Sequence, residues 1–556
     1  MTLLKKAALS VLLFLVFFLP FVNKPFHIDD GNFISMSKAI GFNPLHIKKI
    51  GIYFMGNYDK DFSPLSSTHP VFIPYFIKLI GSIFGIREIP LHIAFFIFTL
   101  IAFWSFYAFI SSIESSAELR VDWRFPVFVS LLLVSNPAYL ANAHDIMTDV
   151  PLLAFWLLTI VLFIKGVDYD NKIYLLLSSV FLVFSILIAY QSLFLIPILA
   201  SYLIINRKPG LCNIASLTGP FIIFAAFILF VSIFYNISAL SSAISESMRW
   251  FRIEKIYGRA LSVSVNTGFA LLFLIIAYVV ALPKRIYVFE GIISLIAAVL
   301  LSLQVDYSLS QWLYLIALST VGIFCIAEFI RITLKEAGEG NNQKRLNLFL
   351  LSWITIVMSY NILFMPFGST RYLLPAIPPL LYIFSKRLWY GVSVPSRQAR
   401  FISGKTLALI ALGLTMMLGL MTAYADYQFA SSYRDMSKEV KAITDKTGEK
   451  VWYMGDWGMH YYMDKQGFHY LTADSNEPRV GDVLIIAKTA SVWNMSFDML
   501  QRVRLIGVRE YDSWFPGRVH SELANAGYYS SSWGYLPFTF SKVPVEVFGI
   551  FRVVRD

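Results

Sequence analysis

Residues 25–33 read PFHIDDGNF and carry two adjacent carboxylates, Asp29 and Asp30. They follow an apolar run, residues 8–22, that is long enough to cross or nearly cross a bilayer. Acidic side chains are costly to bury there, so they are either solvated or held for chemistry. Solvation is the simpler explanation for an isolated pair. The other loops predicted on the same side of the membrane, one acidic and one basic and aromatic, favour chemistry.

The composition indicates a membrane protein. The chain has 556 residues, of which 57% are hydrophobic and only 15% charged, and its repeated long apolar runs are typical of a polytopic helical membrane protein. The net charge of +11 comes mostly from short loops between these runs. We interpret it as a positive-inside bias and not as nucleic-acid binding. Cys212 and Cys325 lie in or beside apolar segments, so the sequence predicts neither a disulfide framework nor a cysteine metal site.

Loop charges predict the topology. Lys5 and Lys6 place the N-terminus in the cytoplasm, so loop 23–90 lies outside, with a short helix at 32–40 and an interfacial helix at 69–84. The loops then alternate in charge without contradiction over about thirteen spans. The predicted spans are residues 8–22, 91–110, 125–140, 152–165, 173–189, 192–205, 214–235, 263–282, 288–303, 312–330, 346–364, 373–384 and 407–424.

Beyond residue 424 the pattern changes to short apolar runs with helical stretches between them. This predicts a small α/β domain of about 130 residues on the outer side. The expected fold is thus a polytopic α-helical membrane protein, with a membrane domain at 1–424 and an extracytoplasmic α/β domain at 425–556. The many aromatic residues of the C-terminal part suit sugar stacking but suit a small core equally, and we favour the core for most of them.

A second acidic loop, residues 141–151, reaches the same outer face and contains His144, Asp145 and Asp149. Asp149 precedes Pro151 at a helix start, so helix capping or a favourable dipole position would explain it. Capping does not explain Asp145, four residues earlier. We regard Asp145 and His144 as candidates on the acceptor side of a site.

Two outer segments carry cations. Loop 236–259 contains Arg249 and Arg252 beside aromatic residues, which suits a phosphate head group but suits an amphipathic interfacial helix equally. Arg371 is a lone outer cation at the mouth of the proline-broken span 373–384. An anionic ligand is one explanation for it, and an ion pair with Asp29, Asp145 or Asp149 is the other.

Familiar catalytic motifs are missing from the sequence. It has no Walker-type loop, no serine nucleophile elbow and no zinc-type His/Glu pair on one helix. A nucleotide-driven pump is therefore not supported. His69 and His144 could join a metal site only through tertiary assembly, and a divalent cation stays an open question.

Four short motifs, in order and on one predicted membrane face, carry a family resemblance. They are Asp29-Asp30 after the first span, His69-Pro70 before the next helix, MTDVPLLAFW at 147–156 and RYLLP at 371–375. Together they resemble the polytopic C-type glycosyltransferases, in particular the dolichyl-phosphate-mannose protein mannosyltransferase and aminoarabinose transferase group. The C-terminal part resembles the tails of some bacterial members.

The resemblance implies an inverting transferase that uses a polyprenyl-phosphate sugar donor on the outer face of the membrane. The loop charges and the prokaryotic character of the C-terminal part predict a bacterial inner membrane with the active site facing the periplasm. By position, Asp29 matches the first-loop catalytic acid of the family and Asp149 the second-loop acid. Asp30, a further candidate catalytic carboxylate, stands where many members have Glu, and its shorter side chain leaves open whether it has the same role. The acceptor, whether a lipid, a glycan or a protein, is left open.

The resemblance also implies a set of donor-phosphate contacts. Arg371 and Tyr372 would face the phosphate, and His69 falls where aminoarabinose transferases carry a lysine near it. Arg249 and Arg252 are further candidates. The alternative function is a transporter or flippase for a lipid-linked glycan, in which the same outer cations guide the head group without breaking a bond. A purely structural membrane protein would explain neither Arg371 nor the clustered acids.

Overall fold

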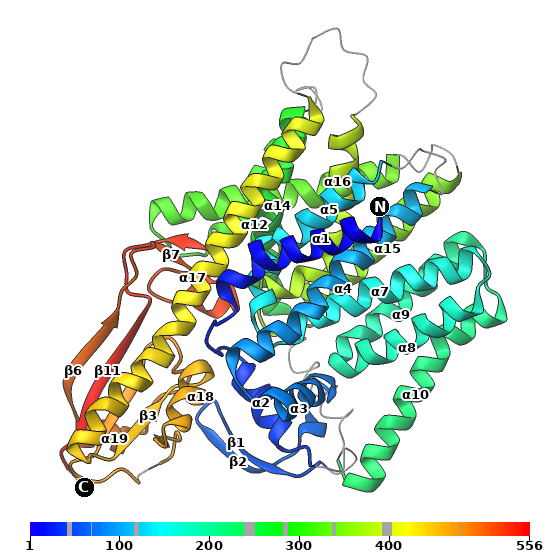
Figure 1. Cartoon of the computed structure of the whole chain (residues 1–556). Helices are drawn as coiled ribbons and strands as arrows, with labels where there is room; N and C mark the ends of the chain where they lie inside the picture. The colour runs from blue at the N-terminus through cyan, green and yellow to red at the C-terminus, as the bar shows by residue number, and fades with distance from the viewer. Residues whose placement is uncertain are drawn as a thin grey trace.

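The computed structural model describes residues 1–41, 47–67, 69–115, 122–237, 251–281, 287–335, 341–391, 403–475 and 477–555. It has two parts, a large helical bundle and a C-terminal domain built on a β-sheet (Figure 1). The long helix α17 (Gly404–Thr447) connects them and packs against both.

Each predicted span overlaps a helix. By length and apolar composition, eight helices in the described part of the chain could cross a membrane, or up to nine if α5 and α6, bent by 57°, count as one span. Helices α8, α9 and α13 are apolar but shorter. The chain is therefore a polytopic helical membrane protein, while the number of thirteen spans stays a prediction. The helices of the bundle are α1 (Leu3–Leu13, continued by η1, Phe14–Phe18, and η2, Leu19–Phe21), α4 (Glu88–Ser115), α5 (Arg124–Ser135), α6 (Pro137–Leu140), α7 (Asp149–Asp168), α8 (Lys172–Ile188), α9 (Leu195–Asn206), α10 (Leu211–Tyr235), α12 (Ile256–Ala281), α13 (Tyr287–Ser302), α14 (Leu309–Lys335), α15 (Asn341–Leu363), α16 (Ile377–Tyr390) and α17 (Gly404–Thr447).

Small residues allow α12 and α14 to pack closely. A Cβ on Gly268 would lie 1.8 Å from the carbonyl oxygen of Leu318, and one on Gly322 equally close to that of Ser264. Glycines that let two backbones approach in this way are typical of membrane helix pairs.

The first outer loop folds into two helices and a hairpin. The two helices predicted there are present as α2 (Asp30–Lys38) and α3 (Phe72–Phe84). Between them lie the antiparallel strands β1 (Ile50–Phe54) and β2 (Asn57–Phe62), which the sequence analysis did not predict. In Figure 1 these elements lie on the side of the bundle that faces the C-terminal domain.

The C-terminal domain has a five-stranded sheet in the order β4-β3-β5-β11-β6. Strand β3 runs parallel to β4 and β5, and β11 runs antiparallel to β5 and β6. The predicted boundary at residue 424 falls inside the continuous helix α17. The elements of the domain are β3 (Val451–Met454), α18 (Trp457–Lys465), β4 (His469–Tyr470), β5 (Val483–Ala487), α19 (Phe497–Arg502), β6 (Val503–Tyr511), β7 (Gly517–Arg518), β8 (His520–Ser521), β9 (Ala526–Gly527), β10 (Thr539–Phe540) and β11 (Glu546–Val553).

The segment that follows β9 holds the domain against the bundle. The amide of Thr370 donates to the carbonyl of Tyr528 at 3.0 Å, and the Tyr528 hydroxyl donates to the carbonyl of Pro137 at 2.9 Å. The amide of Tyr535 donates to the Tyr307 hydroxyl at 2.7 Å. The first of these bonds holds the loop that ends at residue 370, directly before the arginine singled out in the sequence.

Candidate active site

Arg371 lies between the two acids that the sequence placed on the same face. Its Nη1 is 3.5 Å from Oδ2 of Asp29 and 3.8 Å from Oδ2 of Asp149. The other terminal nitrogen, Nη2, lies 3.5 Å from the Tyr372 hydroxyl, and the guanidinium is 5.2 Å from the centre of that ring. This geometry agrees with both explanations of Arg371, an ion pair and an anionic ligand. The ion pairs exist, but they are long enough to leave the guanidinium able to bind an anion.

The Asp29 carboxylate is not used by its own helix. Asp29 occupies the N-cap position of α2, yet its side chain makes no capping hydrogen bond. Its side chain is 31% exposed, against 10% for Arg371 and 7% for Asp149. The preceding residue, Ile28, has φ of 49°, a conformation that a β-branched residue rarely adopts and that costs on the order of 1–3 kcal/mol. The strained turn thus holds a carboxylate that stays partly exposed.

Asp30 holds this turn in place. It is fully buried, and its two carboxylate oxygens accept hydrogen bonds from the backbone amides of His27 at 3.0 Å and Ile146 at 2.8 Å. Burial raises the pKa of Asp30 well above its usual range, and the nearby carboxylate of Asp145 adds to the shift. A catalytic role was expected for Asp30 as a second carboxylate. In this arrangement, both of its oxygens already accept hydrogen bonds from backbone amides.

His69 lies at the edge of the same site. Its ring is 5.8 Å from that of Phe33, and its Nδ1 has no hydrogen-bond partner among the described residues. Burial lowers the pKa of His69 to about 4, with Arg371 adding to the decrease and Asp29 opposing it. The imidazole is therefore neutral near pH 7, which differs from a lysine that would bring a charge to a phosphate.

Arg371 keeps its charge although it is buried. Burial by itself would lower the pKa of its guanidinium, but Tyr372, Asp149 and Asp29 raise that pKa above its usual value. The Nε–H of Arg371 has no hydrogen-bond partner within the described part of the chain. A permanent cation with an unused donor, next to a partly exposed carboxylate, can bind an anionic oxygen.

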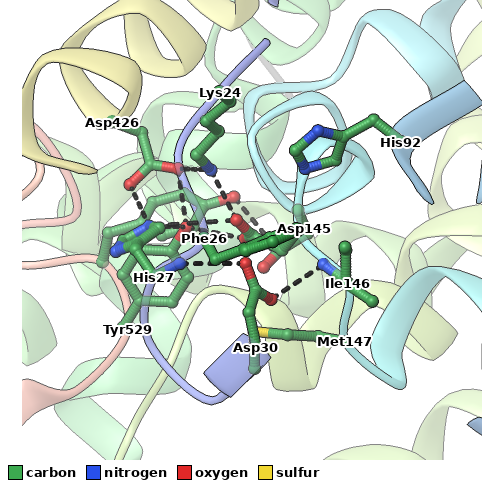
Figure 2. A network of polar contacts seen from close by, with 12 residues as sticks. Lys24, Phe26, His27, Asp30, His92, Asp145, Ile146, Met147, Asp426 and Tyr529 are labelled. Carbon is green, nitrogen blue, oxygen red and sulfur yellow. Dashed lines mark hydrogen bonds and ion pairs between the residues drawn. The ribbon is translucent and has the colours of Figure 1, made fainter. Parts of the chain in front are cut away.

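A second polar network lies behind the strained turn (Figure 2). The ammonium of Lys24 is 2.5 Å from Oδ1 of Asp145 and also bonds to Oδ2 of Asp426. Nε2 of His27 lies 3.0 Å from the other oxygen of Asp426. The Tyr529 hydroxyl is within hydrogen-bond distance of both carboxylates, 2.8 Å from Asp145 and 2.7 Å from Asp426. The network joins the first outer loop, the second outer loop, α17 and the C-terminal domain.

This network bears on the question of a divalent cation. Within the described ranges, one group of ligand-type side chains is close enough to hold a metal, namely His27, Asp145 and Asp426. The ammonium of Lys24 bonds to both of these carboxylates, so it already supplies the positive charge between them. As arranged, these residues fit an internal lysine and not a metal ion.

The acceptor-side candidates are buried. Asp145 is 2% exposed and belongs to the Lys24 network. His144 is 1% exposed, and its ring lies 4.7 Å from that of Phe18 and 4.9 Å from that of Phe21. Neither side chain presents an atom to an acceptor, because the loop between α6 and α7 folds into the bundle instead of reaching solvent.

Two predicted donor contacts are not brought to the site by any observed contact. Arg249 lies outside the described residues. Arg252 is exposed, and its guanidinium lies 3.8 Å from the carboxylate of Glu254. Their roles at a donor phosphate stay predictions.

Sequence reasoning missed Lys24, Asp426 and Tyr529. Lys24 did carry a signal, since it is a cation at the outer end of a span, the feature that drew attention to Arg371. Asp426 follows the last predicted span by two residues. Tyr529 offers no such signal, because only the docking of the C-terminal domain brings it to the network.

Asp456 links the first outer loop to the C-terminal domain and predicts a pH effect. Its carboxylate accepts the backbone amide of Met55 at 2.9 Å and the Tyr470 hydroxyl at 2.8 Å. Burial raises the pKa of Asp456 to about 6, so the folded protein binds this proton more tightly than the unfolded chain. The stability it contributes is present at low pH and is lost as the pH rises through 6.

We expect ionisation of the Asp456 carboxyl to lower the free energy of unfolding by roughly 1 kcal/mol between about pH 5 and about pH 7. Thermal melts of detergent-solubilised wild type and Asp456→Asn at both pH values measure it as the difference in pH dependence. Equal pH dependence in the two proteins would contradict the assignment.

Comparisons with known proteins agree with this architecture. Residues 68–235 match the family model of dolichyl-phosphate-mannose-protein mannosyltransferase. ArnT from Cupriavidus metallidurans, solved bound to undecaprenyl phosphate, is similar with a TM-score of 0.52 and 12% sequence identity, over 88% of this chain and 94% of that chain. The resemblance to C-type glycosyltransferases is confirmed. The matched stretch contains Asp149 and His69 but neither Asp29 nor Arg371.

A second solved structure is less similar. The oligosaccharyltransferase of Archaeoglobus fulgidus in its apo form has a TM-score of 0.44 and 11% identity, over 84% of this chain and 64% of that chain. Comparison with curated protein sequences gave no match.

Proposed function

We propose that the protein is an inverting membrane glycosyltransferase. It moves a sugar from a polyprenyl-phosphate donor to an acceptor on the outer, periplasmic side of a bacterial inner membrane. The observation that carries the proposal is the buried Arg371, whose Nε–H is unused within the described part of the chain, 3.5 Å from the partly exposed carboxylate of Asp29. The ArnT structure with bound undecaprenyl phosphate supports a polyprenyl phosphate as the ligand.

The proposed step needs a base and a stabiliser of the leaving group. An acceptor hydroxyl or amine attacks the anomeric carbon on the face opposite the phosphate, and its proton passes to the Asp29 carboxylate. The bond between that carbon and the phosphate oxygen breaks, and its electron pair stays on the oxygen. Arg371 stabilises the charge that develops there, with Tyr372 beside it. Attack from the opposite face inverts the configuration.

Asp149 takes a supporting role in this scheme. It is the first residue of α7 and lies 3.8 Å from Arg371, and its side chain is far less exposed than that of Asp29. It orients the guanidinium or the acceptor, while Asp29 is the carboxylate that an incoming acceptor meets. Asp30 and Asp145 support the loops behind the site.

The alternative is a transporter for a lipid-linked glycan, and one experiment separates the two functions. Purified protein is incubated with a synthetic polyprenyl-phosphate hexose and with extracted membrane lipid, glycan and protein fractions as acceptors, and released polyprenyl phosphate is measured. Release that depends on protein and acceptor is expected. Binding of the donor without release, for every acceptor fraction, would favour the transporter.

Arg371 gives a sharper prediction for the donor phosphate. We expect Arg371→Gln to lower the rate of polyprenyl phosphate release about a hundredfold, since one charge-stabilising donor is lost. Arg371→Lys keeps the charge but not the planar guanidinium, so its rate is expected to lie between those of wild type and Arg371→Gln. Initial rates and the affinity for polyprenyl phosphate measure both effects, with thermal melts to check folding. A larger loss in Arg252→Gln than in Arg371→Gln would assign the phosphate contact to the loop before α12.

A further inference from the structure

A cavity lies at the end of the bundle opposite Asp29 and Arg371. It has a volume of about 690 Å³ and lies between α1, α4, α7 and α8. Its lining includes Lys6 near the start of α1 and Lys165 near the end of α7, whereas the first outer loop follows the other end of α1 and Asp149 begins α7. In Figure 1 the N-terminus lies on the side of the bundle away from the C-terminal domain.

The lining combines cations, hydroxyl groups and amphipathic rings. Lys6 places its ammonium 5.7 Å from the centre of the Trp104 ring, and the indole of Trp104 donates to the Ser10 hydroxyl at 3.1 Å. Tyr107 and Tyr174 add further rings with polar tips. Tryptophan, tyrosine and lysine are the residues found where membrane helices meet the head groups.

The two lysines of the cavity have no acidic partner in the part of the chain that the structure describes. Among the described residues, no carboxylate lies within ion-pair distance of Lys6 or Lys165. Two acids at the same helix ends have other partners: Asp168 is 3.2 Å from Lys208, and Glu114 is 2.9 Å from Lys386. Within the described part of the chain, the cavity therefore carries a net positive charge.

We infer that this cavity binds the head group of an anionic phospholipid. The phosphate lies between the two ammonium groups, and the acyl chains extend along the apolar surface of α1, where Leu4, Val11 and Leu12 are exposed. A volume of this size suits a head group, and basic pockets between membrane helices on the cytoplasmic side bind such lipids. Under the predicted topology the lipid belongs to the inner leaflet. The inference does not depend on the proposed function, because none of these residues lies at the candidate active site.

The test measures retained lipid and not turnover. Purified wild type is reconstituted into nanodiscs of phosphatidylcholine mixed equally with phosphatidylglycerol, extracted with mild detergent, and analysed by native mass spectrometry. The protein is expected to retain phosphatidylglycerol over phosphatidylcholine. The variant Lys6→Gln/Lys165→Gln is expected to lose this preference by roughly 25- to 30-fold, since each lysine near an anionic head group contributes about fivefold in affinity and two such factors multiply. Lys172→Gln, which removes an exposed lysine at the same helix ends outside the cavity, is the matched control and should behave as wild type.

Three results would overturn the inference. The double variant could retain phosphatidylglycerol as well as wild type does, or wild type could retain both lipids equally, which would remove the anionic head group from the cavity. Displacement of the retained lipid by inorganic phosphate alone would assign the lysines to a soluble anion. Thermal melts of the two variants show whether each is folded, and single Lys6→Gln and Lys165→Gln proteins replace the double variant if it is not.

Discussion

Asp29→Asn is expected to lower the rate of transfer from a polyprenyl-phosphate sugar by about 10² to 10⁴, the range that a positioned general base contributes. The amide keeps the size of the side chain but cannot take the proton of the acceptor. Folding should be nearly unaffected, because Asp29 makes no capping hydrogen bond to α2 and its ion pair with Arg371 is long, at 3.5 Å. Initial rates of polyprenyl phosphate release measure the effect.

A matched control separates this role from a general effect of removing acids in the outer loop. Asp59 lies in the exposed strand β2 of the same loop, and its carboxylate accepts only a local backbone amide, that of Asp61, among the contacts observed. Asp59→Asn should therefore release polyprenyl phosphate at the rate of wild type. Near-normal turnover in Asp29→Asn would remove Asp29 from the role of base, and Asp149→Asn would then be the next variant to test.

The helical bundle could be predicted because its signal is local. An apolar run long enough for a bilayer must form a helix to satisfy its own backbone, so every predicted span overlaps a helix of the structure. The hairpin of β1 and β2 was missed, since its strands are short and its turn relies on positive φ at Met55 and Gly56. The spacing of apolar residues does not predict such a turn between two mostly exposed strands.

The candidate site was predictable to the extent that it depends on which side of the membrane each loop lies. Asp29, Asp149 and Arg371 were expected on one membrane face, and the structure places both carboxylates within 4 Å of the Arg371 guanidinium. The inner network was not predictable in the same way. Lys24, Asp145, Asp426 and Tyr529 are separated by more than a hundred residues at each step, and only tertiary packing makes them neighbours.

The second large expected effect is a loss of stability when Lys24 is replaced, because its ammonium is buried between two carboxylates. Lys24→Met is expected to destabilise the protein by about 3 to 5 kcal/mol, the cost of removing one partner of a buried ion pair. Methionine has a similar length, so packing changes little, but Asp145 and Asp426 would face each other without the ammonium. The pKa of Lys24, which burial lowers and the two carboxylates raise, lies above its usual value, so the charge is present at every pH at which the protein is studied.

Thermal melts and chemical denaturation in detergent measure this loss, with Lys38→Met as the control because Lys38 is an exposed lysine on α2. A melt of Lys24→Met equal to that of wild type would mean that the two carboxylates are satisfied without Lys24. If Lys24→Met does not accumulate, Asp426→Asn added to it provides the second measurement. The added substitution removes one of the two unpaired charges and should restore part of the stability, although by itself Asp426→Asn is destabilising. This non-additivity, about 0.5 to 3 kcal/mol, distinguishes an ion pair from independent packing at the two positions.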